Sequence, residues 1–154
     1  MLSTAQRFGL GRVYRDATAE AQRRGDRRVG TEHLALALLA DSESVTARAL
    51  GVSLTAGRDA LRALDRQALA SVGIDADFTG QVLPGREGER LRLTPAAKAV
   101  FTGLRKEVAK GQRLGVQHVL LVLLSRPRPD PGAELLDALG VDRTQARRRL
   151  QDLS

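Results

Sequence analysis

The stretch VGTEHLALALL, residues 29–39, decides the fold of this chain, because it joins a short polar cluster to an almost unbroken apolar run. The chain writes nearly the same phrase again as LGVQHVLLVLL at residues 114–124, so that His33 returns as His118. Apolar residues occupy every side of the helix that each run predicts, and both helices should therefore be buried. Two copies of so specific a phrase indicate a duplicated unit.

A second repeated phrase supports the duplication. ALGVSLTAGRDAL at residues 49–61 matches ALGVDRTQARRRL at residues 138–150, and the preceding link ADSES becomes the longer, Pro-rich SRPRPDPG in the second copy. One unit of about 55–60 residues, written twice, explains both phrases. We expect a single domain over residues 1–154, divided into a first repeat at 3–69, a connector at 70–92 and a second repeat at 93–153.

Each repeat is predicted to hold four helices, which makes an all-α fold of eight helices related by a pseudo-two-fold axis. Ser3 and Gln6 have the spacing of a capping box, and Thr94-Pro95 is a typical helix start. The glycines of GLG at residues 9–11 fall inside the first helical pattern, where they weaken it. The expected helices are 3–24, one beginning at 31, about 44–50, about 53–69, 94–110, 116–125, 131–139 and 142–153.

The composition favours helices packed through aliphatic side chains. Hydrophobic residues make up 42% of the chain, but there are only three Phe, one Tyr and no Trp, so Leu, Val and Ala must build the core. The absence of cysteine excludes disulfides and thiol catalysis. The first residues, MLSTAQRF, lack a signal pattern, and no apolar run reaches the roughly 20 residues of a membrane span. These features predict a soluble, cytoplasmic protein.

The net charge of +7 raises the question of nucleic-acid binding. The 25 basic residues are 22 Arg and only 3 Lys, grouped in RRGDRR (23–28), RPR (126–128) and RRR (147–149). No aromatic residues alternate with them, although proteins that bind single strands stack bases on aromatic rings. We interpret the clusters as solvated helix faces, and a regulatory or nucleic-acid-associated protein stays the alternative.

Motifs for catalysis and for metal or cofactor binding are missing. There is no GxxxxGK[ST] phosphate loop, no GxGxxG, no GxSxG and no HExxH. His33 and His118 open the two buried helices, where a His usually bonds to the backbone or packs between helices. We expect no catalytic residue, no metal site and no cofactor, and hence no enzyme.

The combination of [VL]-G-[TV]-[EQ]-H before a Leu-rich helix, the repeated ALGV and the phrase LTPAAK (93–98) resembles the Clp N-terminal domain, the double repeat at the front of ClpA- and ClpC-type unfoldases. The resemblance covers residues 3–153. It implies a non-catalytic docking module that binds substrates or adaptors of the Clp system, with ClpC and ClpP as partners. Because the chain ends where an ATPase would begin, we expect a stand-alone N-domain that acts as adaptor or decoy.

The resemblance also implies binding sites, including one for phosphorylated arginine in ClpC. A carboxylate offers guanidinium two acceptors, and backbone N–H groups at a helix start attract phosphate. The expected pocket consists of Val29, Gly30, Thr31 and Glu32. A second pocket, degenerate because it lacks the acid and the hydroxyl, consists of Leu114, Gly115, Val116 and Gln117.

Two interpretations of Glu32 stay open. It is either the ligand-binding acid or an acid that merely favours the positive end of the helix dipole. The resemblance further implies a surface for cyclic-peptide antibiotics such as cyclomarin, where this chain offers Leu2, Leu93 and Lys98. The family has aromatic rings at the first two positions, so we expect weaker binding of such peptides here.

Overall fold

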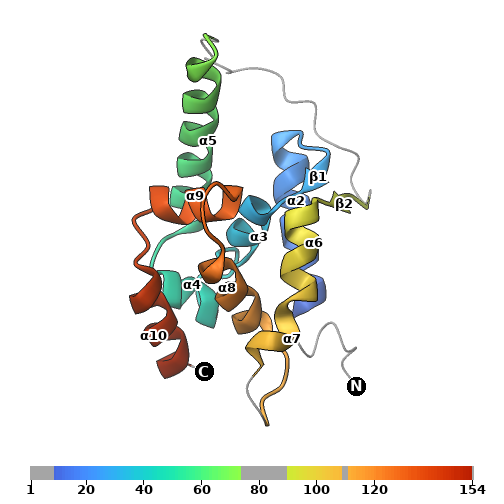
Figure 1. Ribbon diagram of the computed structural model, residues 1–154, viewed down its shortest axis with the longest axis vertical. Helices are drawn as coiled ribbons and strands as arrows, with labels where there is room; N and C mark the ends of the chain where they lie inside the picture. Colours follow the sequence, from blue (N-terminus) through green and yellow to red (C-terminus); the bar gives the residue numbers. More distant parts are fainter. Residues whose placement is uncertain (1–8, 74–89, 109–110, 154) are drawn as a thin grey trace.

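The computed structural model describes residues 9–73, 90–108 and 111–153, which form the all-α fold that the sequence predicts (Figure 1). Helix numbering begins at α2. The elements are α2 (Leu10–Arg24), β1 (Arg28–Val29), α3 (Thr31–Ala37), α4 (Val45–Leu50), α5 (Leu54–Ser71), β2 (Arg92–Leu93), α6 (Pro95–Thr102), α7 (Leu104–Glu107), α8 (Val116–Ser125), α9 (Pro131–Ala138) and α10 (Arg143–Leu153). Within these ranges no helix is both long and apolar enough to cross a membrane.

The two Leu-rich helices α3 and α8 form the centre of the core, as their composition predicts. Helix α3 packs against α2, α5, α6, α8 and α9, and α8 packs against α4, α6, α7, α9 and α10. In Figure 1 the other helices lie around this pair, with α2 and α6 on one side and α4 and α10 on the other. The Leu side chains of the first phrase, two within α3 and two directly after it, are 0–3% exposed: Leu34, Leu36, Leu38 and Leu39.

Most helix starts follow from short polar side chains that accept a backbone N–H two or three residues into the helix. Thr94, which precedes Pro95, accepts from the Ala97 amide, as the sequence predicts, and Asp142 accepts from the Gln145 amide at the start of α10. Ser44, Ser53 and Asp130 do the same for α4, α5 and α9. These ends are settled by local sequence.

Two predicted helices are interrupted at glycines. Gly9 has φ +73°, a left-handed conformation that Gly adopts without strain, and α2 begins after it and not inside a continuous 3–24 helix. The predicted helix 94–110 divides at Gly103, whose amide hydrogen points at the carbonyls of both Ala99 and Val100. The described residues therefore contain nine helices where eight were expected for the chain. Ser3 and Gln6, the proposed capping box, lie outside the described residues.

A parallel pair of two-residue strands is present that the sequence analysis did not predict. Arg28 pairs with Arg92, and Val29 pairs with Leu93. The Thr94 amide extends the pairing by donating to the Val29 carbonyl at 2.8 Å. Since two residues carry no readable periodicity, only the packing of the two repeats brings these segments together.

The start of α3 is bonded to the start of α9, which belongs to the other repeat. The Thr31 hydroxyl donates to Asp130 Oδ2 at 3.0 Å and accepts from the Gly132 amide at 2.9 Å. The two backbones approach so closely that a Cβ on Gly132 would lie 2.9 Å from the Thr31 Cβ. Thr31 is 1% exposed, so water cannot replace either hydrogen bond.

Thr31→Val should therefore destabilise the protein by about 1–3 kcal/mol, because it leaves the buried Gly132 amide without an acceptor while keeping the side-chain shape. Urea denaturation measures the change. Thr102→Val is the matched control, since Thr102 is exposed and its hydroxyl donates to the Ala99 carbonyl in its own helix. Equal midpoints for the two variants would contradict the structural role of Thr31.

Candidate functional site

The repeated polar phrase forms the same local structure at the starts of α3 and α8. Gly30 and Gly115 are the N-cap residues, both with extended backbones. His33 Nδ1 accepts the Gly30 N–H at 2.8 Å, and His118 Nδ1 accepts the Gly115 N–H at 2.9 Å. This is one half of a capping box, since glycine has no side chain to bond in return. Both imidazoles are buried, as expected of structural histidines that bond to the backbone.

His33 has a further, acidic partner. Because Nδ1 accepts a hydrogen bond, the neutral ring carries its proton on Nε2, which donates to Asp26 Oδ2 at 2.7 Å. The same carboxylate oxygen accepts from Arg24 Nε at 2.9 Å, and Arg24 also contacts Asp65 on α5. A chain of hydrogen bonds thus connects α5 to the start of α3. Sequence reasoning missed Asp26 and Arg24, although they lie within the RRGDRR cluster.

This chain of bonds shifts the pKa values of its members. Burial alone would lower the pKa of His33, but the neighbouring carboxylates of Asp26 and Glu32 outweigh it and raise that pKa above its ordinary value. Burial would raise the pKa of Asp26, but the hydrogen bonds from His33 and Arg24 hold it below its ordinary value. These shifts favour a charged Asp26 and make His33 easier to protonate than an ordinary imidazole, and a proton on Nδ1 would replace the hydrogen bond that it accepts from the Gly30 N–H.

Glu32 folds back over the start of α3. Its Oε1 lies 3.1 Å from His33 Nδ1, and a Cβ on Gly30 would overlap the carboxylate. Gln117 folds over Gly115 in the same way. The glycine of the motif thus makes room for the side chain two residues later. Exchanging Glu for Gln keeps this shape and removes only the charge.

The other members of the predicted first pocket face inward. Val29 is 0% exposed and pairs within the short sheet, and Thr31 holds α9. The Glu32 side chain keeps 16% of its surface exposed. The side-chain chemistry that this end of α3 presents to solvent is therefore that of one carboxylate. The four residues of the second predicted pocket are each half-buried: Leu114, Gly115, Val116 and Gln117.

Two of the three residues predicted to contact cyclic peptides lie within the described part of the chain. Leu93 is half-buried in β2, and Lys98 is exposed on α6, one turn beyond the helix start. Leu2 lies outside the described residues. The structure thus places two of the three positions on neighbouring elements.

A shallow groove of about 440 Å³ between α5 and α9 was not predicted. Its apolar side comes from Ala60, Ala63 and Leu64, and Arg128, Glu134 and Asp137 form its polar side. No motif marks these residues, because they come from different repeats and meet only in the folded chain. Among the residues that the structure describes, no three His, Asp or Glu side chains are grouped so as to hold a metal ion.

Comparison with known proteins identifies relatives of this chain. The family described as Clp repeat (R) N-terminal domain matches residues 10–112. The negative regulator of genetic competence ClpC/MecB of Bacillus subtilis (strain 168) is 31% identical to this chain over 140 residues. The match covers 89% of this chain and 15% of that protein, so the chain spans less than a sixth of its relative's length.

The Asp26–His33 contact predicts a pH effect. Asp26→Asn should lower the pKa of His33, because it removes the charge that stabilises the imidazolium. The depressed pKa of Asp26 contributes stability above about pH 3.9 that is lost as pH falls through its folded value. The raised pKa of His33 contributes stability below about pH 6.5 that is lost as pH rises through its folded value.

The wild type should exceed Asp26→Asn in stability most between about pH 4 and 6.5, where both groups are charged. Imidazole NMR titration measures the pKa, and urea denaturation at several pH values measures the stability. Asp59→Asn serves as the control, because Asp59 is exposed on α5 and pairs with Arg62, one turn along the same helix. An unchanged His33 pKa in Asp26→Asn would contradict the contact.

Proposed function

This chain belongs to the Clp repeat N-terminal domain family, and we propose that it is a non-catalytic docking module that binds protein segments for Clp-dependent proteolysis. Its role would be that of an adaptor or decoy, with substrates, adaptors and a ClpC-type unfoldase with its ClpP peptidase as partners. Fold alone does not settle a function, so the proposal depends on the chemistry of the site. The observation that carries it is the partly exposed Glu32 carboxylate at the start of α3.

The chemistry of Glu32 suits a guanidinium group. A carboxylate pairs with guanidinium through two parallel hydrogen bonds, and a partly buried site strengthens them. We propose arginine side chains, phosphorylated arginine above all, as the ligand. His33 lies 3.1 Å from the same carboxylate and competes with the ligand when it is protonated.

The two copies of the motif should differ in affinity. Gln117 has the folded-back shape of Glu32 and keeps one acceptor, but it carries no charge. Charge-assisted hydrogen bonds are about twice as strong as neutral ones. Val116 also replaces the hydroxyl of Thr31, but that hydroxyl is buried and holds α9 in the first repeat. The charge at Glu32 is therefore the difference that matters for binding.

Glu32→Gln should weaken binding of a phosphoarginine peptide about tenfold, because a charged pair becomes a neutral one. Gln117→Glu should create a second site, raising the stoichiometry from one to two. Isothermal titration calorimetry measures both values. An unphosphorylated arginine peptide, titrated in parallel, shows how much of the affinity comes from the phosphoryl group.

Glu43→Gln is the matched control, since Glu43 is exposed in the loop before α4 and its loss changes the net charge by the same amount. Equal affinities of wild type, Glu32→Gln and Glu43→Gln would overturn the assignment of the pocket. An equal loss of affinity in Glu32→Gln and Glu43→Gln would mean that only the net charge of the protein matters.

Cyclomarin-like peptides should bind weakly, because the chain has Leu93 in place of an aromatic ring and has Leu at position 2 as well. Leu93→Phe should strengthen binding several-fold, since a buried aromatic contact contributes about 1 kcal/mol beyond its area. Calorimetry against wild type and Leu121→Phe, a half-buried Leu of α8, tests the position. Nanomolar binding by the wild type would contradict the expectation.

A further inference from the structure

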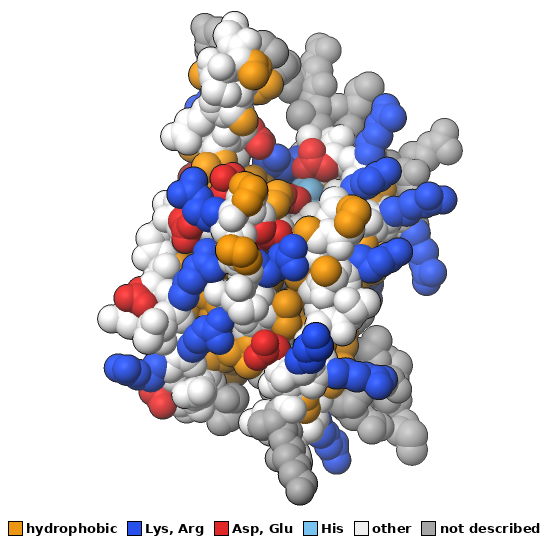
Figure 2. All heavy atoms as spheres, in the orientation of Figure 1, with side chains coloured by type: hydrophobic (Ala, Val, Ile, Leu, Met, Phe, Trp, Pro, Cys, Tyr) orange, Lys and Arg blue, Asp and Glu red, His pale blue; other side chains and the backbone are white. Residues whose placement is uncertain are grey.

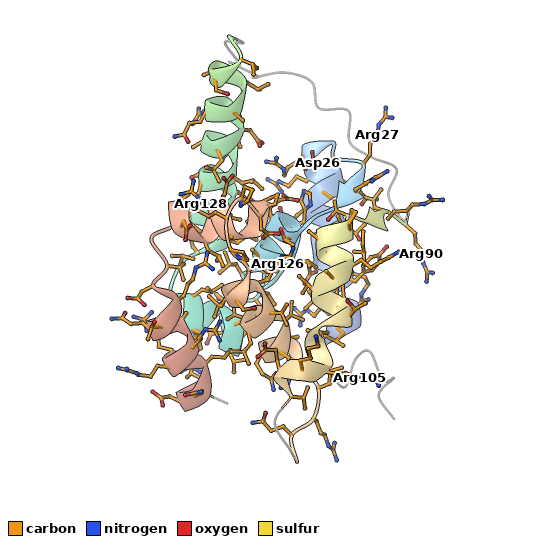
Figure 3. All side chains as sticks on the ribbon, in the orientation of Figure 1. Asp26, Arg27, Arg90, Arg105, Arg126 and Arg128 are labelled. Carbon is orange, nitrogen blue, oxygen red and sulfur yellow. The ribbon has the colours of Figure 1, made fainter. Side chains whose placement is uncertain are left out.

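A row of exposed Lys and Arg side chains lies along one side of the molecule. Figure 2 shows Lys and Arg side chains gathered over β1, β2, α6 and α7, and Figure 3 shows Arg27, Arg90 and Arg105 pointing outward along this side. We name this surface the basic strip. It consists of seven residues, all exposed: Arg27, Arg28, Arg90, Arg92, Lys98, Arg105 and Lys106.

The strip has few anions of its own. Between Arg90 and Lys106 the sequence contains five basic residues and no acid. None of the seven cations forms an ion pair with any carboxylate in the described part of the chain, whereas several other arginines do, such as Arg58 with Glu20. Asp26 borders the strip, but Arg24 and His33 already occupy its carboxylate.

The centre of the strip is a pair of arginines held side by side. Arg28 and Arg92 are register partners in the parallel sheet, and both point to solvent while Val29 and Leu93 face the core. Adjacent strands lie about 4.8 Å apart, and like charges at such positions repel. An anion that bridges the two guanidinium groups removes this repulsion. The sheet therefore presents a preformed binding site for a carboxylate.

The remaining cations extend the basic strip along α6 and α7. Lys98 is exposed on α6, and Arg105 and Lys106 are exposed on α7, which begins after the break at Gly103. Helix α6 has 8 residues and rises about 12 Å at 1.5 Å per residue. An extended peptide of about four residues has the length of α6 alone, at about 3.3 Å per residue.

From this charge pattern we propose that the basic strip binds an acidic, extended segment of a partner protein, and that Arg28 and Arg92 together bind one carboxylate of it. An acidic peptide complements the strip in charge and in length. Single-stranded nucleic acid fits less well, because the described part of the strip exposes no aromatic ring for stacking: Phe101 is half-buried, and the Tyr14 hydroxyl donates to the Leu91 carbonyl. The strip would bind through its cations, whereas the arginine pocket proposed beside it would bind through the Glu32 carboxylate.

The test uses a fluorescein-labelled peptide of about eight residues rich in Glu and Asp, with anisotropy as the readout. The wild type should bind it. The affinity should fall as salt rises from 0.1 to 1 M, because the distance over which charges attract one another shortens. Arg28→Gln with Arg92→Gln should weaken binding about tenfold, as expected for the loss of two exposed charge pairs. A peptide with Gln and Asn at the acidic positions should not bind.

Arg48→Gln with Arg148→Gln is the matched control, because both residues are exposed on α4 and α10, on the other side of α8, and the loss of charge is equal. This control should retain binding within about twofold. Glu32→Gln should also retain it, which separates this surface from the arginine pocket. Equal weakening by both arginine pairs, or binding of a DNA duplex more tightly than the peptide at 0.15 M salt, would overturn the proposal.

Discussion

The structure depends on covering two short helices that are apolar on every side. Helix α3 cannot be buried by its own repeat, because α2 and α5 cover only part of it and α6, α8 and α9 of the second repeat cover the rest. The same holds for α8, which rests on α4 of the first repeat. Hydrophobic burial therefore makes the two repeats share one core. The Thr31–Asp130–Gly132 hydrogen bonds then hold the two halves in one arrangement.

Neighbouring residues at the polar start of α3 have different roles. Gly30 and His33 close the helix start, and Thr31 holds the other repeat. The Glu32 carboxylate is partly exposed beside Gly30, and the Asp26 carboxylate, which holds His33, is partly exposed as well. A motif that looks functional as a whole is thus mostly structural, and the proposed binding chemistry is concentrated in one carboxylate. The same division explains how α8 keeps the local structure while having Gln117 in place of the acid.

The helix starts and the buried helices were predictable because their causes are local. The caps at Thr94 and Asp142 act within one turn, and the backbone bonds of the two histidines span three residues. The breaks at glycines were not predicted, since Gly is tolerated inside helices and only its surroundings decide whether a helix continues. The short sheet was missed because its pairing joins residues 64 positions apart, Arg28 and Arg92.

The sequence by itself determined the all-α class, the two buried helices and the resemblance of the repeated phrase to the Clp N-terminal domain. Only the tertiary structure decided that Thr31 turns inward to α9 and Glu32 outward, and that Asp26 fixes the His33 ring. It also decided that Arg28 and Arg92 stand side by side. Periodicity and caps act over a few residues, whereas these contacts exist only once distant segments have packed on the shared core.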